Sequence, residues 1–194
     1  MPAPCRRPGI WIVPDDAYER LYYGADGTAG AGGATAAACA PSFLDLAERE
    51  ERVIATNTFS KSWLMTGWRL GWLVAPQPLV PEIAKLIEFN TSCTPGFVQH
   101  AGLAAITQGE PVIARTLGRM RRARDFLIER LRGIEGIQAA MPAGAMYAFF
   151  RVQGMSDSLA FCKRMVVEAG LGLAPGAAFG PEGEGFIRWC FAAV

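Results

Sequence analysis

Residues 58–71 read Thr58-Phe-Ser-Lys61-Ser-Trp-Leu-Met65-Thr-Gly-Trp-Arg69-Leu-Gly71, so a single lysine lies among hydroxyl groups and glycines. Lysine condenses with carbonyl compounds to form Schiff bases when its surroundings leave the amine uncharged. Arginine offers a fork of donors that suits a phosphate group. Lys61 and Arg69 in one stretch therefore indicate a ligand with both an aldehyde and a phosphate, which suggests pyridoxal 5'-phosphate.

On either side of this stretch, short apolar runs alternate with longer helical patterns, which is typical of an α/β protein. Strands are expected at 9–14, 53–58 and 70–74, and helices at 42–51 and 81–89. Ser42 with Asp45 three residues later comes close to a capping box at the start of the first of these helices. Open α/β sheets bind ligands at the carboxyl ends of their strands. Asp15 and Lys61 each follow an expected strand, so both stand where a site is expected.

The second half of the chain has a mixed pattern. Helices are expected at 97–107, 111–132 and 156–170, and strands at 137–140, 146–152, 171–174 and 185–191. The helix at 111–132 carries seven arginines. We expect them to form a solvated basic face that pairs with Glu110, Asp125 and Glu129.

Composition limits the classes of function. The 194 residues carry a formal net charge of +1, so no strong field favours nucleic acid or an anionic membrane as a partner. Five scattered cysteines without a C-x-x-C pair argue against a disulfide framework and a zinc site, and fit a reducing cytoplasm. The apolar run at 10–13 is too short for a membrane span or a signal sequence. A cytoplasmic protein without a metal is expected.

Residues 24–40 form a low-complexity stretch rich in glycine and alanine. Such a composition predicts a flexible surface loop. Its glycines lack the strand-turn-helix context of a phosphate-binding loop, so a phosphate role is disfavoured.

Three segments, in order, resemble one protein family. The stretch around Lys61 resembles the Ser-x-Ser-Lys-x-x-x-Met-Thr-Gly-Trp-Arg-x-Gly signature of the fold-type I pyridoxal phosphate-dependent aminotransferases, the class I/II family that includes aspartate aminotransferase. Residues 13–19, Val-Pro-Asp-Asp-Ala-Tyr-Glu, resemble its Asp-x-x-Tyr segment, and residues 175–180 with 185–192 resemble its carboxylate-binding end. The resemblance covers nearly all of this chain but only the C-terminal half of such an enzyme.

The resemblance implies a fold and an assembly. It assigns the chain to the α/β class as part of the PLP-dependent transferase fold, with the C-terminal half of the large-domain sheet and an α+β small domain. Residues 1–108 would be a partial large, cofactor-binding domain, and residues 109–194 the small C-terminal domain without its last helix. Enzymes of this family are usually homodimers, so a homodimer is expected.

The resemblance also implies roles for the residues that match its motifs. Lys61 would hold the cofactor aldehyde in a Schiff base and move the substrate proton. Asp15 would pair with the pyridine nitrogen, with Asp16 as the alternative, although an acid at a strand end can also simply cap a turn. Tyr18 would donate to the phenolic oxygen of the cofactor, although a tyrosine there can equally be a core residue.

Arginines and hydroxyls complete the expected site. Arg69, helped by the hydroxyls of Thr58 and Ser60, would bind the cofactor phosphate. Arg188 lies in an apolar strand and would be costly to bury without an anionic partner. In the family that partner is the α-carboxylate of the substrate.

The function implied is transamination between an amino acid and a 2-oxo acid. A lyase or decarboxylase on the same scaffold is a second hypothesis, because the same residues serve several outcomes. A regulatory domain that senses the cofactor and an inactive truncated product are two others. Since the N-terminal half of the enzyme has no counterpart here, we expect the chain alone to bind the cofactor weakly and to transaminate poorly.

Overall fold

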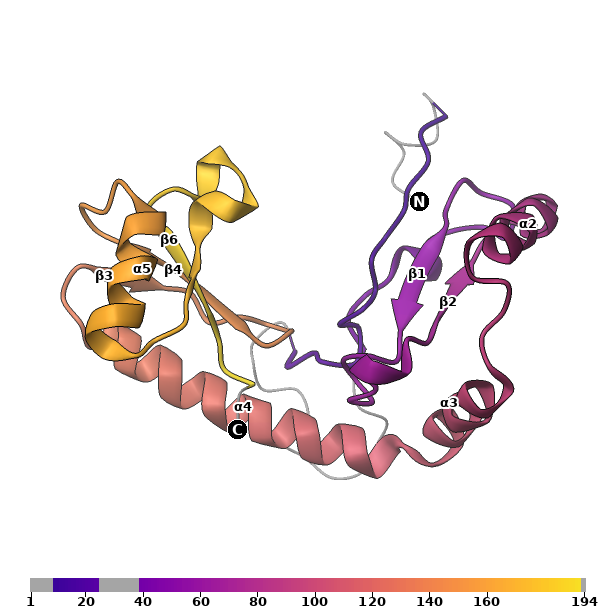
Figure 1. Cartoon of the computed structure of the whole chain (residues 1–194), viewed down its shortest axis with the longest axis horizontal. Helices are drawn as coiled ribbons and strands as arrows, with labels where there is room; N and C mark the ends of the chain where they lie inside the picture. The colour runs from indigo at the N-terminus through magenta and orange to yellow at the C-terminus, as the bar shows by residue number, and fades with distance from the viewer. Residues whose placement is uncertain (1–8, 25–38, 193–194) are drawn as a thin grey trace. The chain divides into compact units, whose positions relative to one another are not determined.

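The computed structural model describes residues 9–24 and 39–192 (Figure 1). The described residues fall into two compact units. Unit 1 lies within 1–22 and 33–116, and unit 2 lies within 23–32 and 117–194. Most of the stretch 24–40 lies outside the described residues, and with it the predicted loop. The assignment of 1–108 and 109–194 to a large and a small domain stays a prediction.

Unit 1 contains a short antiparallel sheet of β1 (Ala55–Thr58) and β2 (Gly71–Val74), in which Thr58 lies opposite Gly71 (Figure 1). A third segment runs parallel to β1 through bridges that join Ile12 to Val53 and Asp15 to Thr56. The strands expected at 53–58 and 70–74 are therefore confirmed. The segment expected as a strand at 9–14 is extended backbone with isolated bridges instead.

The helices of unit 1 follow the apolar pattern closely. They comprise η1 (Phe43–Asp45), η2 (Thr66–Trp68), η3 (Gln77–Leu79), α2 (Val80–Thr91), α3 (Gly96–Gln108) and the beginning of α4 (Glu110–Arg132). The capping box of Ser42 and Asp45 is confirmed. The helix expected at 42–51, however, is only the single 3₁₀ turn η1. None of its residues is buried, so it has no core face against which a longer helix could be stabilised.

An aromatic cluster packs beside the sheet of unit 1. The ring centroids of Phe59 lie 5.0 Å from those of Trp63 and of Trp72. The indole N–H of Trp63 donates to the carbonyl of Ala105, at 2.9 Å, and so ties the loop after β1 to α3. The cluster thus anchors the segment that carries Lys61. Trp68 stays outside it and is 45% exposed.

Unit 2 is a four-stranded antiparallel sheet with the order β3-β4-β6-β5. Its elements are β3 (Ile137–Ala139), β4 (Tyr147–Val152), α5 (Ser158–Ala169), β5 (Ala174–Pro175), η4 (Gly176–Phe179), η5 (Pro181–Gly183) and β6 (Phe186–Cys190). Along β4 and β6 the side chains alternate between the two faces. Ala148, Phe150 and Ile187 are buried on one face, whereas Phe149 and Arg188 lie on the other. The strands expected at 137–140, 146–152 and 185–191 and the helix expected at 156–170 are confirmed with shorter bounds. The strand expected at 171–174 is displaced to the two residues of β5.

The basic helix α4 differs from its prediction in two respects. Glu110, expected to pair with the arginines of the helix, pairs with Arg20 instead, at 2.6 Å. Arg124 is only 2% exposed, and its guanidinium carbon lies 4.4 Å from the ring centroid of Tyr23. The guanidinium donates to the carboxylate of Asp125, at 2.8 Å, and to the carbonyl of Pro142, at 3.1 Å. The fully solvated face that the arginine spacing predicts is therefore wrong for Arg124. Its charge is buried because tyrosine, carboxylate and carbonyl groups satisfy it.

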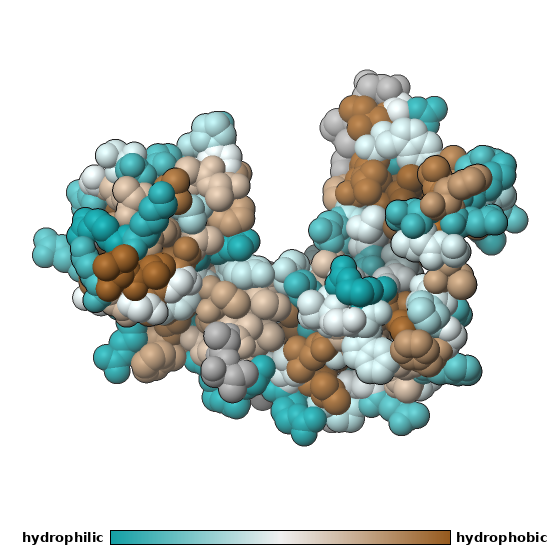
Figure 2. All heavy atoms as spheres, viewed as in Figure 1, coloured by the Kyte–Doolittle hydropathy of each residue, from teal (hydrophilic) through white to brown (hydrophobic). Residues whose placement is uncertain are grey.

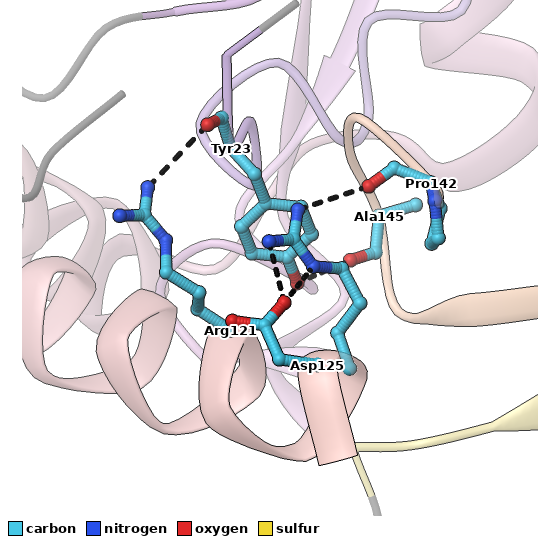
Figure 3. Close-up of polar contacts among 6 residues, drawn as sticks. Tyr23, Arg121, Asp125, Pro142 and Ala145 are labelled. Carbon is cyan, nitrogen blue, oxygen red and sulfur yellow. Dashed lines mark hydrogen bonds and ion pairs between the residues drawn. The ribbon is translucent and has the colours of Figure 1, made fainter. Parts of the chain in front are cut away.

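Tyr23 joins the same cluster through its backbone and hydroxyl (Figure 3). Its hydroxyl donates to the carbonyl of Ala145 and its N–H to that of Ala143, both at 2.7 Å, and its carbonyl accepts from Arg121. Burial raises the pKa of Tyr23 to about 12. The turn before β4 is thus fastened to residue 23 and to α4.

Candidate functional site

Lys61 lies three residues beyond the end of β1, as the sequence predicts. Hydrogen bonds hold its loop in place: the N–H of Met65 donates to the carbonyl of Phe59, at 3.2 Å, and the Thr66 hydroxyl to that of Ser60, at 3.0 Å. Leu64 has a φ of 57°, in the left-handed region that non-glycine residues rarely adopt. Lys61 is therefore displayed by a tight and well-bonded turn.

Two hydroxyls gather at the end of β1. The Thr58 Oγ1 lies 2.9 Å from the Ser60 Oγ, and the N–H of Ser60 donates to Thr58 Oγ1, at 3.1 Å. Thr58 Oγ1 also lies 3.2 Å from the carbonyl oxygen of Leu70, the residue before β2. The sheet pairing accordingly brings the two hydroxyls and the start of β2 to one place.

Arg69 stands two residues before β2 and closes η2 in a left-handed conformation, with a φ of 52°. One of its N–H groups donates to the carbonyl of Thr66, at 2.9 Å, and the side chain is exposed. Since β1 and β2 are antiparallel, the start of β2 lies beside the end of β1, where Lys61 follows. Arg69 and Lys61 thus both lie in the segment that connects β1 to β2, at one end of the two-stranded sheet.

Two neighbouring carboxylates are distinguished by their contacts. Asp16 accepts a hydrogen bond from the Ser42 hydroxyl, at 2.7 Å. Asp15 is exposed and, among the described residues, accepts only from the N–H of Ala17, at 3.1 Å. The bridge between Asp15 and Thr56 places Asp15 beside the end of β1. Its carboxylate, unlike that of Asp16, accepts from no other side chain among the described residues.

Tyr18 is half-buried in the turn that follows Asp15, and its carbonyl accepts from the N–H of Leu21, at 2.8 Å. Glu19 lies next to it, and the pKa of its carboxyl is raised by burial and by the nearby charge of Asp16. Tyr18 and Lys61 both belong to unit 1.

Six of the seven predicted site residues lie in unit 1: Asp15, Tyr18, Thr58, Ser60, Lys61 and Arg69. They supply a carboxylate, a phenol, two hydroxyls, an amine and a guanidinium near the carboxyl end of β1, which lies beside the amino end of β2. This donor set fits a group that combines an aldehyde, a basic ring nitrogen and a phosphate. Among the described residues, no cluster of histidine, cysteine and carboxylate side chains could hold a metal.

Arg188 lies in unit 2, on β6, directly opposite Phe149 on β4. Its guanidinium carbon is 4.4 Å from the ring centroid of Tyr147 and 4.3 Å from that of Phe179. Neither ring was predicted from the sequence as a partner of Arg188. Period-two alternation along the expected strand at 146–152 could have indicated the face on which Tyr147 lies, whereas the position of Phe179 depends on how a turn folds back.

A pocket of about 470 Å³ lies between the β1–β2 sheet and α2. Its lining is mostly apolar, with Trp72, Leu73, Val80 and Ile83 among the residues. Neither Lys61 nor Arg69 lines it. The pocket is therefore separate from the candidate site.

Comparison with known sequences identifies a family. The sequence matches the family described as aminotransferase class I and II over residues 3–194. It is 33% identical over 187 residues to an aspartate aminotransferase of Musicola paradisiaca, with 94% of this chain and 43% of that protein covered. It is 32% identical over 187 residues to an aspartate aminotransferase of Thermotoga maritima, with 96% and 44% covered.

Solved structures agree. The crystal structure of the Thermotoga maritima aspartate aminotransferase matches with a TM-score of 0.81 at 31% identity, covering 97% of this chain and 45% of that one. An aromatic aminotransferase from Pyrococcus horikoshii matches with a TM-score of 0.85 at 29% identity, covering 98% and 48%. The chain thus has a partial aminotransferase fold of the mixed α/β class. It spans about half the length of the relatives it matches.

Proposed function

Because the chain belongs to the aminotransferase class I and II family, we propose that it supplies much of a pyridoxal 5'-phosphate site and serves amino-group transfer between an amino acid and a 2-oxo acid. The single observation that carries this proposal is the strand pairing in unit 1, in which Lys61 follows β1, Arg69 precedes the paired strand β2 and Asp15 is bridged to β1. The relatives are themselves aminotransferases, which favours transfer over lyase or decarboxylase chemistry.

The cofactor supplies an aldehyde that takes up an amino group and a ring that delocalises the electron pair left when a proton departs. Lys61 would be the residue that holds that aldehyde, and its amine would be the base for the proton on the substrate Cα. Asp15 would pair with the ring nitrogen and keep it protonated, since its carboxylate, unlike that of Asp16, accepts from no other side chain among the described residues. Tyr18 would donate to the phenolic oxygen.

Three other residues would hold the phosphate. Arg69 would provide a charged fork, and the Thr58 and Ser60 hydroxyls, 2.9 Å apart, would donate to it. Arg188 binds the α-carboxylate of the substrate. Since that group is common to α-amino acids and 2-oxo acids, the proposal covers both partners of the exchange.

We propose a homodimer in a reducing cytoplasm for the complete enzyme. Apolar side chains of α2 and α3 are exposed in this chain, with Phe89 at 91% and Phe97 at 71%, and hydrophobic atoms show at the surface in Figure 2. Such surfaces support a partner subunit or further chain. The five cysteines are scattered without a C-x-x-C pair, a pattern typical of proteins in a reducing compartment. No helix among the described residues is long and apolar enough to cross a membrane.

Covalent labelling tests the proposal. The chain has three lysines, Lys61, Lys85 and Lys163, so the latter two are internal controls. Lys85 pairs with Glu82, at 2.8 Å, on an exposed helix face. The purified 194-residue chain is treated with excess pyridoxal 5'-phosphate, reduced with borohydride, digested and analysed by mass spectrometry.

We expect preferential modification of Lys61, which falls when Arg69 is changed to Ala or Asp15 to Asn. Modification of the other two lysines stays the same in these variants. Equal labelling of all three lysines in the wild-type chain would show that Lys61 has no special affinity for the cofactor and would contradict the proposal. A Lys61→Arg variant controls for the identity of the labelled peptide.

A further inference from the structure

Two aromatic rings contact the guanidinium of Arg188. Its central carbon lies 4.4 Å from the ring centroid of Tyr147 and 4.3 Å from that of Phe179. Arg188 is half-buried, and among the described residues its side chain forms no ion pair and donates no hydrogen bond. Its charge is thus met by aromatic faces, while its N–H donors remain available. We call Tyr147 and Phe179 the aromatic pair.

The sheet places Tyr147. On the antiparallel strands β4 and β6, Tyr147 lies opposite Cys190, which is two residues from Arg188 on the same face. Diagonal neighbours across a strand pair are within reach of long and aromatic side chains. Phe149 is directly opposite Arg188, but its ring stacks on Phe186, with centroids 5.0 Å apart and planes 3° apart.

A folded turn places Phe179. Phe179 is the last residue of η4. The turn is so tight that a Cβ on Gly176 would lie only 2.1 Å from the carbonyl oxygen of Gly183, so glycine is required there. The N–H of Ala177 donates to the hydroxyl of the buried Ser158, at 3.3 Å. Ser158 in turn donates from its N–H to Glu184, at 2.8 Å. The turn is therefore fastened to the start of α5, which holds Phe179 although its side chain is 51% exposed.

We propose that the aromatic pair positions the Arg188 guanidinium to receive a carboxylate. Arginine has a long side chain, and immobilising such a chain is one of the costs of binding. Attraction to the ring faces already restricts the guanidinium in the ligand-free protein, so less side-chain conformational entropy is lost when the carboxylate binds. The inference rests on the proposed role of Arg188. Tyr147 and Phe179 are positioning residues, because they act through the arginine.

Arginine side-chain NMR tests the inference on the 194-residue chain. The Nε–Hε signal of Arg188, assigned with Arg188→Lys, reports the mobility of the guanidinium through its relaxation. Phe179→Leu and Tyr147→Leu remove a ring but keep apolar bulk. Tyr147→Phe keeps the ring, and Phe126→Leu removes a ring on α4 that contacts the guanidinium of Arg130 instead, so these two are the controls. The dissociation constant is measured with 2-oxoglutarate as the probe.

We expect the Nε–Hε bond of Arg188 to become more mobile in Phe179→Leu and Tyr147→Leu, and the probe to bind roughly three- to tenfold more weakly. Tyr147→Phe and Phe126→Leu should match the wild-type chain in both measurements. Near-native dispersion of the other amide signals shows that the variants fold.

The outcomes separate two kinds of failure. If Arg188 stays as rigid in Phe179→Leu as in the wild type and the affinity is unchanged, while Arg188→Leu abolishes binding, the positioning role is overturned and Arg188 remains the carboxylate site. If the probe leaves the Arg188 signal of the wild-type chain unmoved at saturating concentration, the proposed role of Arg188 fails, and the inference with it.

Discussion

The Glu184 carboxylate joins two segments of unit 2. It accepts hydrogen bonds from the N–H of Gly185, at 2.9 Å, and from the N–H and hydroxyl of Ser158, at 2.8 and 3.2 Å. These bonds lower the pKa of Glu184 below its ordinary value, and the bond from the Gly185 N–H has the largest effect. Because the charged form is the one that accepts the bonds, this carboxylate stabilises the turn of residues 176–185 only while it is ionised.

A pH dependence follows for the Glu184 contacts. Since the pKa is lower in the folded state, their contribution is present above the unfolded value of 4.5 and is lost as the pH falls through the folded pKa. We expect Glu184→Gln to lower the melting temperature at neutral pH and to flatten its decline in acid. Thermal unfolding followed by circular dichroism across this range measures both. Glu182→Gln, on the same turn, is the control, and identical acid profiles for Glu184→Gln and the wild type would contradict the prediction.

Strand pairing in unit 1 depends on a close backbone contact. A Cβ built on Gly71 would lie 2.5 Å from the carbonyl oxygen of Asn57. The neighbouring pair of Thr58 and Gly71 aligns the end of β1 with the start of β2. The same pairing puts Arg69 at the end of the sheet where Lys61 follows β1. The close contact therefore matters for the candidate site as well as for the sheet.

Gly71→Ala should therefore destabilise the chain by about 1–3 kcal/mol, because the new methyl group forces β2 away from β1. Urea unfolding followed by tryptophan fluorescence measures the change, and labelling of Lys61 should fall with it. Gly67→Ala is the matched control, since a Cβ there meets nothing within 4 Å. Equal stability of the two variants would show that the strands accommodate the methyl group.

Helix α4 contributes a buried cation to unit 2. The Arg124 guanidinium contacts the Tyr23 ring and the Pro142 carbonyl, so one side chain connects residue 23, the helix and the turn before β4. Its ion pair with Asp125 has a carboxylate that is 49% exposed, so solvent screens part of that attraction.

Arg124→Met should cost about 1–3 kcal/mol of unfolding free energy, because it leaves the part-buried carbonyl of Pro142 without this donor and removes the contact with the Tyr23 ring. Chemical denaturation provides the measurement. Arg122→Met, at an exposed position of the same helix, should change the free energy by less than about 0.5 kcal/mol. A smaller loss for Arg124 than for Arg122 would refute the structural role given to the buried arginine.

Unit 1 exposes more apolar surface than its own elements can cover. Large side chains of α2 and α3 are exposed, and the pocket between α2 and the sheet is open and mostly apolar. The strand β2 pairs with β1 alone among the described strands, so its second edge is available for pairing. Phe89 and Phe97 are the most exposed of these side chains on their helices.

The 194-residue chain should consequently self-associate through this surface. Changing Phe89 and Phe97 together to Lys is expected to shift the sedimentation-velocity distribution toward monomer by adding charge to the exposed patch. Labelling of Lys61 should be unaffected, since neither phenylalanine belongs to the site. Val167→Lys, at an exposed position of α5 in unit 2, is the control. A monomeric wild-type chain at high concentration would contradict the prediction.

Several parts of the site follow from local sequence. The turn after β1 that carries Lys61, the position of Asp15 at the end of an extended segment and the capping box at Ser42 all depend on neighbours a few residues apart. Short-range patterns report such features directly. The choice between Asp15 and Asp16 gains support only from the fold, because Ser42, which engages Asp16, lies 26 residues away.

Sequence alone is sufficient here for the family, the order of most strands and helices and the residues that match the cofactor motifs, since these are carried by contiguous residues. The tertiary structure decides that Arg124 is buried while other arginines of α4 are exposed, and that Tyr147 and Phe179 contact Arg188. The physical reason is that burial of a long cationic side chain depends on which distant groups satisfy its charge. Helical or strand periodicity specifies the face of an element but not what packs against it.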